Sequence, residues 1–251
     1  MHCIRGLLVA AALSVPVSIA GAQAPRPASP PAPRMGMSEQ IVMAVEEAMG
    51  EHMDSNPHLA LTPTRGAGAG DSARAAKVVA ELRRGIEKYK DPAAAVADGF
   101  RMFAPRVMEQ PVYHYIHPTR MLVEQSRWDP AAPSSLLYRR TPAGSIELIG
   151  AMYMASPQAS LEELDARVPL SVARWHKHVN YCFPDERRRL TEAKDGKPLF
   201  GPVGTIASRE ECAAAGGRFS PEIFGWMVHA NVFAGSDAKA IWGHGSSHHH
   251  Q

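Results

Sequence analysis

Two histidines separated by a single residue, His176 and His178, are the strongest sign of chemistry in this sequence. They lie in the run Arg-Trp-His-Lys-His-Val-Asn-Tyr-Cys, which begins at Arg174. On an extended strand, residues two apart point to the same side, and the strand rise puts the two imidazoles about 7 Å apart. Neutral imidazole nitrogens are common protein ligands for zinc and copper, so both side chains can bind one ion.

The residues around this pair favour a strand. Aromatic and β-branched residues are frequent here, and Pro169 and Pro184 stand on either side. A helix would not put residues two apart on one face. Along a continuous strand, the alternation predicts Asn180 and Cys182 on the face of the histidines, and Tyr181 on the opposite face.

A third histidine, His229, lies in another strand-like run over residues 224–233. If the two strands are neighbours, three imidazoles converge and one coordination position stays open, as in catalytic zinc sites and many copper sites. His114, inside the run Val-Tyr-His-Tyr-Ile, is the preferred fourth ligand. On a continuous strand His117 faces the other way, unless the strand breaks at Pro118.

The sequence thus predicts a transition-metal site for copper or zinc whose ligands are His176, His178, His229 and His114. The function that follows is storage, transport or buffering of the ion. Two alternatives stay open: a metal-dependent hydrolase or oxygenase that uses the same histidines, and a structural or envelope-interaction domain whose histidines only form hydrogen bonds in a sheet. Thioethers are soft ligands for Cu(I), so Met152 and Met227 become candidates if they border the histidines.

The sequence also predicts export. Residues 1–22 combine Arg5, an apolar run and small residues before a cleavage position, which is the pattern of a secretory signal peptide. The apolar run is shorter than the ~20 residues that span a bilayer, so a soluble periplasmic or secreted protein is expected after cleavage. Residues 23–37 read as a proline-rich disordered linker, and residues 244–251 as a flexible His-rich tail.

Two cysteines remain after removal of the signal peptide, Cys182 and Cys212. In an oxidising compartment the simplest expectation for such a pair is a disulfide bond. Closing a loop of this length stabilises the fold by about 3.5 kcal/mol in the chain-entropy model. The alternative is that Cys182 is a thiolate ligand beside the histidines, which requires a reduced thiol.

The charge balance gives no reason to expect a nucleic-acid partner. The chain has 27 basic and 25 acidic residues, whereas proteins that bind nucleic acid present a basic surface. The expected partner is therefore a metal ion, and the sequence leaves the oligomeric state open.

The pattern of apolar residues predicts one α+β domain over residues 38–243. Helices are expected over residues 38–52, 71–90 and 93–100, the last of them capped by Asp91. Five strands are expected over 112–116, 136–140, 146–154, 173–183 and 223–233. Short helical insertions are expected over 160–165 and 208–215, where Ser208 and Glu211 are placed as a capping box. Because no regular helices separate these strands, the sheet is predicted to be antiparallel, covered by the N-terminal helices and closed by one disulfide.

Parts of the chain resemble an uncharacterised family of secreted bacterial proteins. The similarity lies in Lys-Tyr-Lys-Asp-Pro-Ala-Ala-Ala over residues 88–95, in His114-Tyr115-Ile116 and in Leu136-Leu137-Tyr138. It implies one exported α+β domain and carries no activity. The three strand histidines are also similar to the cupin pattern, but the cupin glutamate is missing, with Tyr181 and Cys182 in its place.

Overall fold

The computed structural model describes residues 53–105, 110, 112–186, 189 and 192–243. All of them belong to the unit Met35–Gln251. The predicted signal peptide, the linker, the first expected helix and the His-rich tail lie outside these residues.

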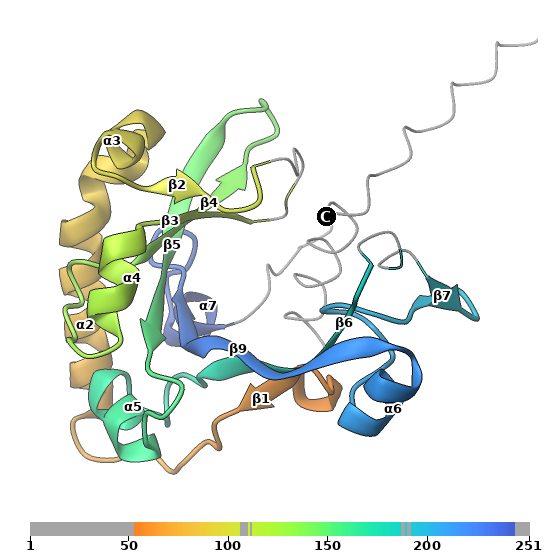
Figure 1. The fold of residues 1–251 in the computed structure, drawn as a ribbon. Helices are drawn as coiled ribbons and strands as arrows, with labels where there is room; N and C mark the ends of the chain where they lie inside the picture. Colours follow the sequence, from red (N-terminus) through yellow and green to blue (C-terminus); the bar gives the residue numbers. More distant parts are fainter. Residues whose placement is uncertain (1–52, 106–109, 111, 187–188, 190–191, 244–251) are drawn as a thin grey trace, which may run out of the picture. The chain divides into compact units, whose positions relative to one another are not determined.

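Seven antiparallel strands form one sheet, in the order β1-β6-β9-β5-β4-β3-β2 (Figure 1). They are β1 (Leu59–Leu61), β2 (Arg101–Met102), β3 (Tyr113–Ile116), β4 (Ser135–Arg140), β5 (Ile146–Ala155), β6 (His176–Pro184) and β9 (Gly217–Ala230). A separate two-stranded hairpin consists of β7 (Ala193–Lys194) and β8 (Lys197–Pro198). The predicted antiparallel α+β fold is confirmed.

Short helices connect these strands. They are η1 (Met53–Ser55), α2 (Asp71–Ile86), η2 (Glu87–Lys90), α3 (Pro92–Ala97), α4 (Pro118–Glu124), α5 (Leu161–Arg167), α6 (Arg209–Ala214) and α7 (Ala238–Trp242). Two helices begin at the capping residues expected from the sequence. Asp91 accepts a hydrogen bond from the Ala93 amide at the start of α3, and Ser208 accepts one from the Glu211 amide at the start of α6. The short strands β1 and β2 and helices α4 and α7 were not predicted.

Helix α2 packs its apolar stripe against one face of the sheet. Leu82 and Ile86 of the helix are fully buried and belong to one core cluster with Tyr138, Ala151 and Tyr153 of the sheet. This arrangement buries the aromatic side chains of β4 and β5. That N-terminal helices as a group cover the sheet stays a prediction, because the first of them falls outside the described residues.

The opposite face of the sheet has its own smaller apolar cluster. It contains Leu137, Ile149, Met152, Met154 and Met227, which come from β4, β5 and β9. Side chains alternate between the two faces of a strand, so Met152 and Met154 lie on this second face while their neighbours in β5 join the helix-covered core. The second face is the one that carries the histidines.

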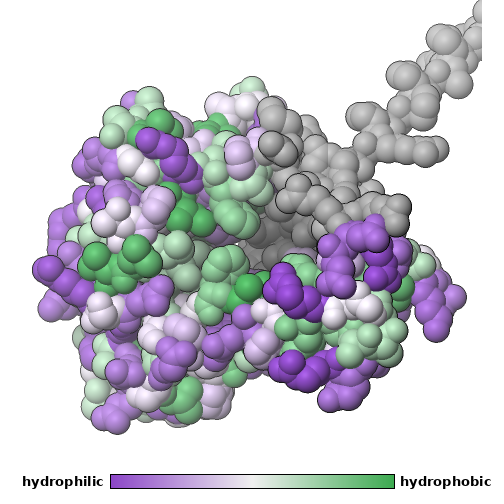
Figure 2. All heavy atoms as spheres, in the orientation of Figure 1, coloured by the Kyte–Doolittle hydropathy of each residue, from purple (hydrophilic) through white to green (hydrophobic). Residues whose placement is uncertain are grey.

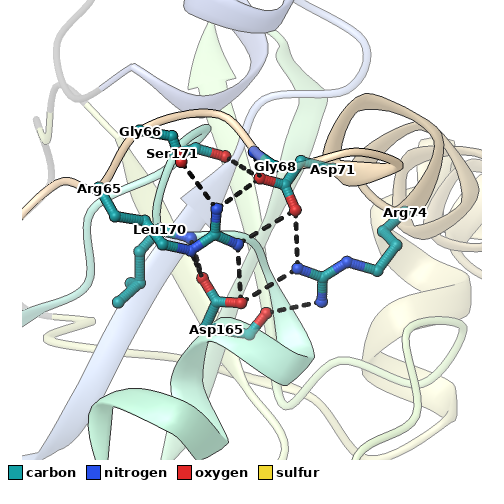
Figure 3. Close-up of polar contacts among 8 residues, drawn as sticks. All are labelled: Arg65, Gly66, Gly68, Asp71, Arg74, Asp165, Leu170 and Ser171. Carbon is teal, nitrogen blue, oxygen red and sulfur yellow. Dashed lines mark hydrogen bonds and ion pairs between the residues drawn. The ribbon is translucent and has the colours of Figure 1, made fainter.

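An ion-pair network ties the loop before α2 to the end of α5 (Figure 3). The carboxylate of Asp71 accepts hydrogen bonds from Arg65, Arg74 and Ser171, and the two arginines also bind Asp165. The Arg65 guanidinium is the main reason why the pKa of Asp71 lies well below its usual range. The network therefore joins the first turn of α2 to α5.

The outer surface mixes hydrophilic and hydrophobic residues over the face shown in Figure 2. Among the apolar side chains that remain accessible, Leu122 of α4 is 69 % exposed. Scattered apolar residues of this kind are normal on folded proteins.

Candidate metal centre

Strand β6 holds the first two predicted ligands between two neighbouring strands. His176 is opposite Leu61 of β1 on one side and Met227 of β9 on the other. His178 is opposite Ile223 of β9. The side chain of His176 is 1 % exposed, so its position is set by packing on both sides.

A bulge in β9 bends this part of the sheet beside the histidines. Residues 224–226 of β9 lie opposite the single residue Lys177 of β6. Phe224 adopts a left-handed backbone with φ 64°. At Gly225, a Cβ atom would lie 1.9 Å from the carbonyl oxygen of Ala155, so only glycine fits. Bulges of this kind redirect side chains and increase the local twist.

The four predicted histidines lie side by side in a row. The ring centres of His178 and His176 are 5.6 Å apart, and those of His176 and His229 are 5.4 Å apart. The ring centre of His114 is 5.7 Å from that of His229. The two central rings therefore each have two imidazole neighbours, and three strands, β3, β6 and β9, contribute to one cluster.

The contact between His114 and His229 requires a strongly curved sheet. Strand β3 is separated from β9 by β4 and β5, which would put the two strands about 14 Å apart in a flat sheet. Leu137 of β4 is opposite Gly150 of β5, and the pairing of the two strands changes register directly after Leu137. A Cβ atom at Gly150 would lie 2.0 Å from the carbonyl oxygen of Ala230, so the absence of a side chain allows the close approach. The sheet is consequently concave on the side of the histidines.

The predicted alternation along β6 is wrong after His178. Asn180 has a left-handed backbone with φ 59°, and its side chain donates a hydrogen bond to the carbonyl oxygen of Pro57. This turns Tyr181 to the side of the histidines, where its hydroxyl lies 2.8 Å from Nδ1 of His178. The sequence offered a weak signal for this, because asparagine tolerates a left-handed backbone better than most residues.

His58, which the sequence analysis did not single out, extends the row. Its Nε2 lies 2.6 Å from the carbonyl oxygen of Gly204, and its ring contacts Tyr181 edge to face with ring centres 5.3 Å apart. Its Nδ1 lies 3.4 Å from the carbonyl oxygen of Val179, so both ring nitrogens of His58 face backbone acceptors. His58 therefore supports Tyr181, which in turn supports His178.

Burial keeps two of the imidazoles neutral. Desolvation lowers the pKa of His114 to about 4, and desolvation, with small contributions from His114 and His58, lowers the pKa of His178 to about 4. Burial also raises the pKa of Tyr181 well above its usual range, so the phenol keeps its proton. A neutral imidazole retains the lone pair that a metal ion needs.

Two methionines border the histidines. Met152 of β5 is directly opposite His229 of β9, and Met227 of β9 is directly opposite His176 of β6. Both side chains are buried, with 6 % and 4 % exposure. Met152 and Met227 are therefore candidate ligands, because they border the histidines as the sequence analysis required.

The predicted disulfide between Cys182 and Cys212 is confirmed, with the two Cα atoms 5.5 Å apart. The bond joins the end of β6 to α6, and its sulfurs pack with Phe200 and Ile206 in a separate small cluster. Because the sulfur of Cys182 is used in this bond, the alternative of a thiolate ligand does not hold for the oxidised protein.

His117 lies outside the histidine row. Strand β3 ends at Ile116 and α4 begins at Pro118, so the strand breaks at the proline. The His117 ring accepts a hydrogen bond from the Arg120 amide at 3.4 Å and packs edge to face on Phe100. This residue therefore serves as the N-cap of α4.

A buried carboxyl group, Glu124, was not anticipated from the sequence. It is the last residue of α4 and accepts hydrogen bonds from the Ser134 hydroxyl and, at 2.9 Å, from the Met154 amide. Within the described part of the chain, its Oε1 has no hydrogen-bond partner. Burial raises the pKa of Glu124 to about 7. Since helix α4 itself was not predicted, no sequence signal indicated that this glutamate is buried.

The side chains are not preset for a metal ion. In the portion of the chain covered by the structure, no group of three or more His, Cys, Asp or Glu side chains has the arrangement needed to hold an ion as it stands. Binding by the histidine row therefore requires rotation of the rings, and the outer torsion of histidine has broad minima.

The chain has no match among protein-family models, curated proteins or solved structures. The resemblance to secreted bacterial proteins thus stays a prediction. None of the helices in the described residues has both the length and the apolar character required to cross a membrane.

Proposed function

We propose that this protein is an exported metal-binding protein that stores, carries or buffers copper or zinc. The ligands are drawn from His114, His176, His178 and His229. The observation that carries the proposal is the row formed by these rings, with successive ring centres 5.6, 5.4 and 5.7 Å apart.

The spacing suits imidazoles that share an ion. A metal–nitrogen distance of ~2.0–2.1 Å puts each ring centre roughly 3 Å from the ion, so two rings at a tetrahedral angle lie about 5 Å apart. Each neighbouring pair of rings in the row exceeds that value by less than 1 Å, a difference that ring rotation and small strand movements can remove for two adjacent imidazoles. The low pKa of His114 and His178 favours the neutral form that binds metal.

The surroundings of His178 also suit a ligand. When Nδ1–H of His178 donates to the Tyr181 oxygen, Nε2 is left with its lone pair for the ion. Metal-binding histidines commonly donate their second ring N–H to an oxygen in this way, which fixes the tautomer and the ring orientation. The disulfide between Cys182 and Cys212 agrees with an oxidising compartment.

An enzymatic function has less support. A metal-dependent hydrolase needs a general base beside the ligands. The residues directly opposite His176, His178 and His229 in the described strands are apolar, namely Leu59, Leu61, Met152, Ile223 and Met227, and none of them can accept a proton in this role. We therefore rank metal binding above metal-dependent catalysis.

Metal analysis of the full chain, purified without an added tag and loaded with copper or zinc before dialysis, tests the proposal. We expect about one ion per chain, by analogy with other mononuclear histidine sites. The double variant His176→Ala, His178→Ala should lose the ion. Because these residues are packed in the sheet, the single variants His229→Gln and His114→Gln provide a second measurement, with folding checked by circular dichroism.

The C-terminal histidines require their own control. A triple variant in which His248, His249 and His250 are replaced by alanine should keep the ion. Loss of the ion in this variant alone, or a wild-type protein that stays metal-free after loading, would contradict the proposal.

A further inference from the structure

The two methionines beside the central histidines distinguish this site from an all-imidazole one. Met152 is the cross-strand partner of His229, and Met227 is the cross-strand partner of His176. These two histidines are the central members of the row. Two thioether groups therefore lie next to the imidazoles that have most contacts with other rings.

The distances between directly opposite residues allow both sulfurs to reach a shared ion. Directly opposite residues of antiparallel strands have Cβ atoms about 4.5–5.5 Å apart. Methionine is unbranched and has three rotatable bonds, so its sulfur can move over several ångströms without moving the backbone. Met152 and Met227 also belong to the same apolar cluster, which keeps both sulfurs on the histidine face.

The chemistry of this ligand set favours a soft ion of low charge. Thioethers bind Cu(I) well and bind zinc poorly, whereas imidazole accepts both. Imidazole and thioether ligands are uncharged, so they do not neutralise the ion. The cost of burying an uncompensated charge grows with the square of that charge, so a monovalent ion is less costly here than a divalent one.

We propose that the site selects copper(I), with Met152 and Met227 supplying thioether ligands beside His176 and His229. This inference rests on the proposed function and specifies its metal. It also gives Met152 and Met227 a role beyond packing.

A matched control comes from the same cluster. Met154 has similar burial, at 4 %, and lies on the same sheet face, but its partner across β9 is Met227 and not a histidine. Replacing any of the three methionines by leucine keeps size and apolar character nearly constant, so packing changes little. The leucine variants at Met152 and Met227 should therefore differ from the variant at Met154 only through the loss of a sulfur ligand.

The experiment is an anaerobic competition between the full chain and a coloured Cu(I) chelator, with a parallel competition for zinc. We expect Met152→Leu and Met227→Leu each to lower the Cu(I) affinity by about tenfold or more, since even indirect partners of a metal site change affinity by 10–100-fold. Zinc affinity should be unchanged, and Met154→Leu should match the wild type. X-ray absorption of the copper-loaded protein should show sulfur neighbours.

The outcomes separate the two proposals. If copper and zinc both fail to bind, the proposed function and this inference fail together. If an ion binds through the histidines but the leucine variants at 152 and 227 match the wild type, this inference is overturned while the proposed function stands. An equal loss in all three leucine variants would assign the methionines to packing and also overturn it.

Discussion

The hydroxyl of Tyr181 lies 2.8 Å from Nδ1 of His178, although three positions along a regular strand put side chains on opposite faces. The left-handed backbone of Asn180 makes this contact possible. Tyr181 also contacts the buried ring of His58. The tyrosine therefore links His58, whose ring is held by the carbonyl oxygen of Gly204, to a proposed metal ligand, and it acts as a positioning residue.

Replacement of Tyr181 by phenylalanine should weaken metal binding without unfolding the protein. The variant removes only the hydroxyl that orients His178, and loss of such an outer partner lowers affinity by about 10–100-fold. Metal competition on the purified variant measures this. Tyr113→Phe is the control, because the Tyr113 hydroxyl binds Arg140 and its ring belongs to the helix-covered core. Equal affinity of the Tyr181 variant and wild type would rule out the positioning role.

The backbone of Asn180 should make this position sensitive to side-chain shape. A β-branched residue is strongly disfavoured at positive φ, so Asn180→Val should lower the free energy of unfolding by about 2 kcal/mol. Asn180→Gly loses the hydrogen bond to Pro57 but tolerates the backbone, so its loss should be about 1 kcal/mol or less. Chemical denaturation compares the two variants. A glycine variant that is no more stable than the valine variant would show that backbone strain is not the main term.

A side chain at Gly150 should disturb both stability and the site. In Gly150→Ala the new Cβ would clash with the carbonyl oxygen of Ala230, so β5 and β9 must move apart. Forced expansion of a packed region typically costs about 1–3 kcal/mol. Because β5 lies between the strands of His114 and His229, this movement should separate the two rings, so metal affinity should fall as well. Gly144→Ser is the control for metal affinity. A side chain at this position meets open space, so the φ of 85° lowers stability only locally and metal affinity should be unchanged. Unchanged metal affinity in Gly150→Ala would mean that the bend is not needed for binding.

The buried carboxyl group of Glu124 should give the protein a measurable pH dependence. Its pKa is raised from 4.5 to about 7 by burial, so the folded state holds a proton that the unfolded state releases earlier. The corresponding stability is fully present below pH 4.5 and is lost as the pH rises through about 7. The size of the effect is about 3 kcal/mol, from ~1.4 kcal/mol per pKa unit.

Comparison of the wild type with Glu124→Gln isolates this contribution. Glutamine can still accept hydrogen bonds from Ser134 and Met154 but cannot ionise. The difference in unfolding free energy between the two proteins should shift in favour of the variant from pH 5 to pH 8. Urea denaturation at several pH values provides the measurement, and parallel stability curves would contradict the predicted ionisation.

Local sequence patterns were sufficient for the longest helix and for five of the strands. The helical spacing of apolar residues identified α2, and alternation and aromatic content identified β3 to β6 and β9. The pair of cysteines that follows the predicted signal peptide identified the bond between Cys182 and Cys212. These features depend on residues close in the chain or on the chemistry of a pair, so they can be read without knowing the fold. His176, His178 and His229 were singled out in the same way.

The relation between these elements was decided only by the tertiary structure. Strand β9 pairs with β5 on one side and β6 on the other, and the rings of His114 and His229 meet although β4 and β5 lie between their strands. Neither long-range strand order nor sheet curvature is encoded in periodicity, because both depend on packing between segments far apart in the chain. For the same reason, the sequence predicted Met152 and Met227 as ligands only on the condition that they border the histidines. Their positions opposite His229 and His176 follow from a register that the folded sheet alone defines.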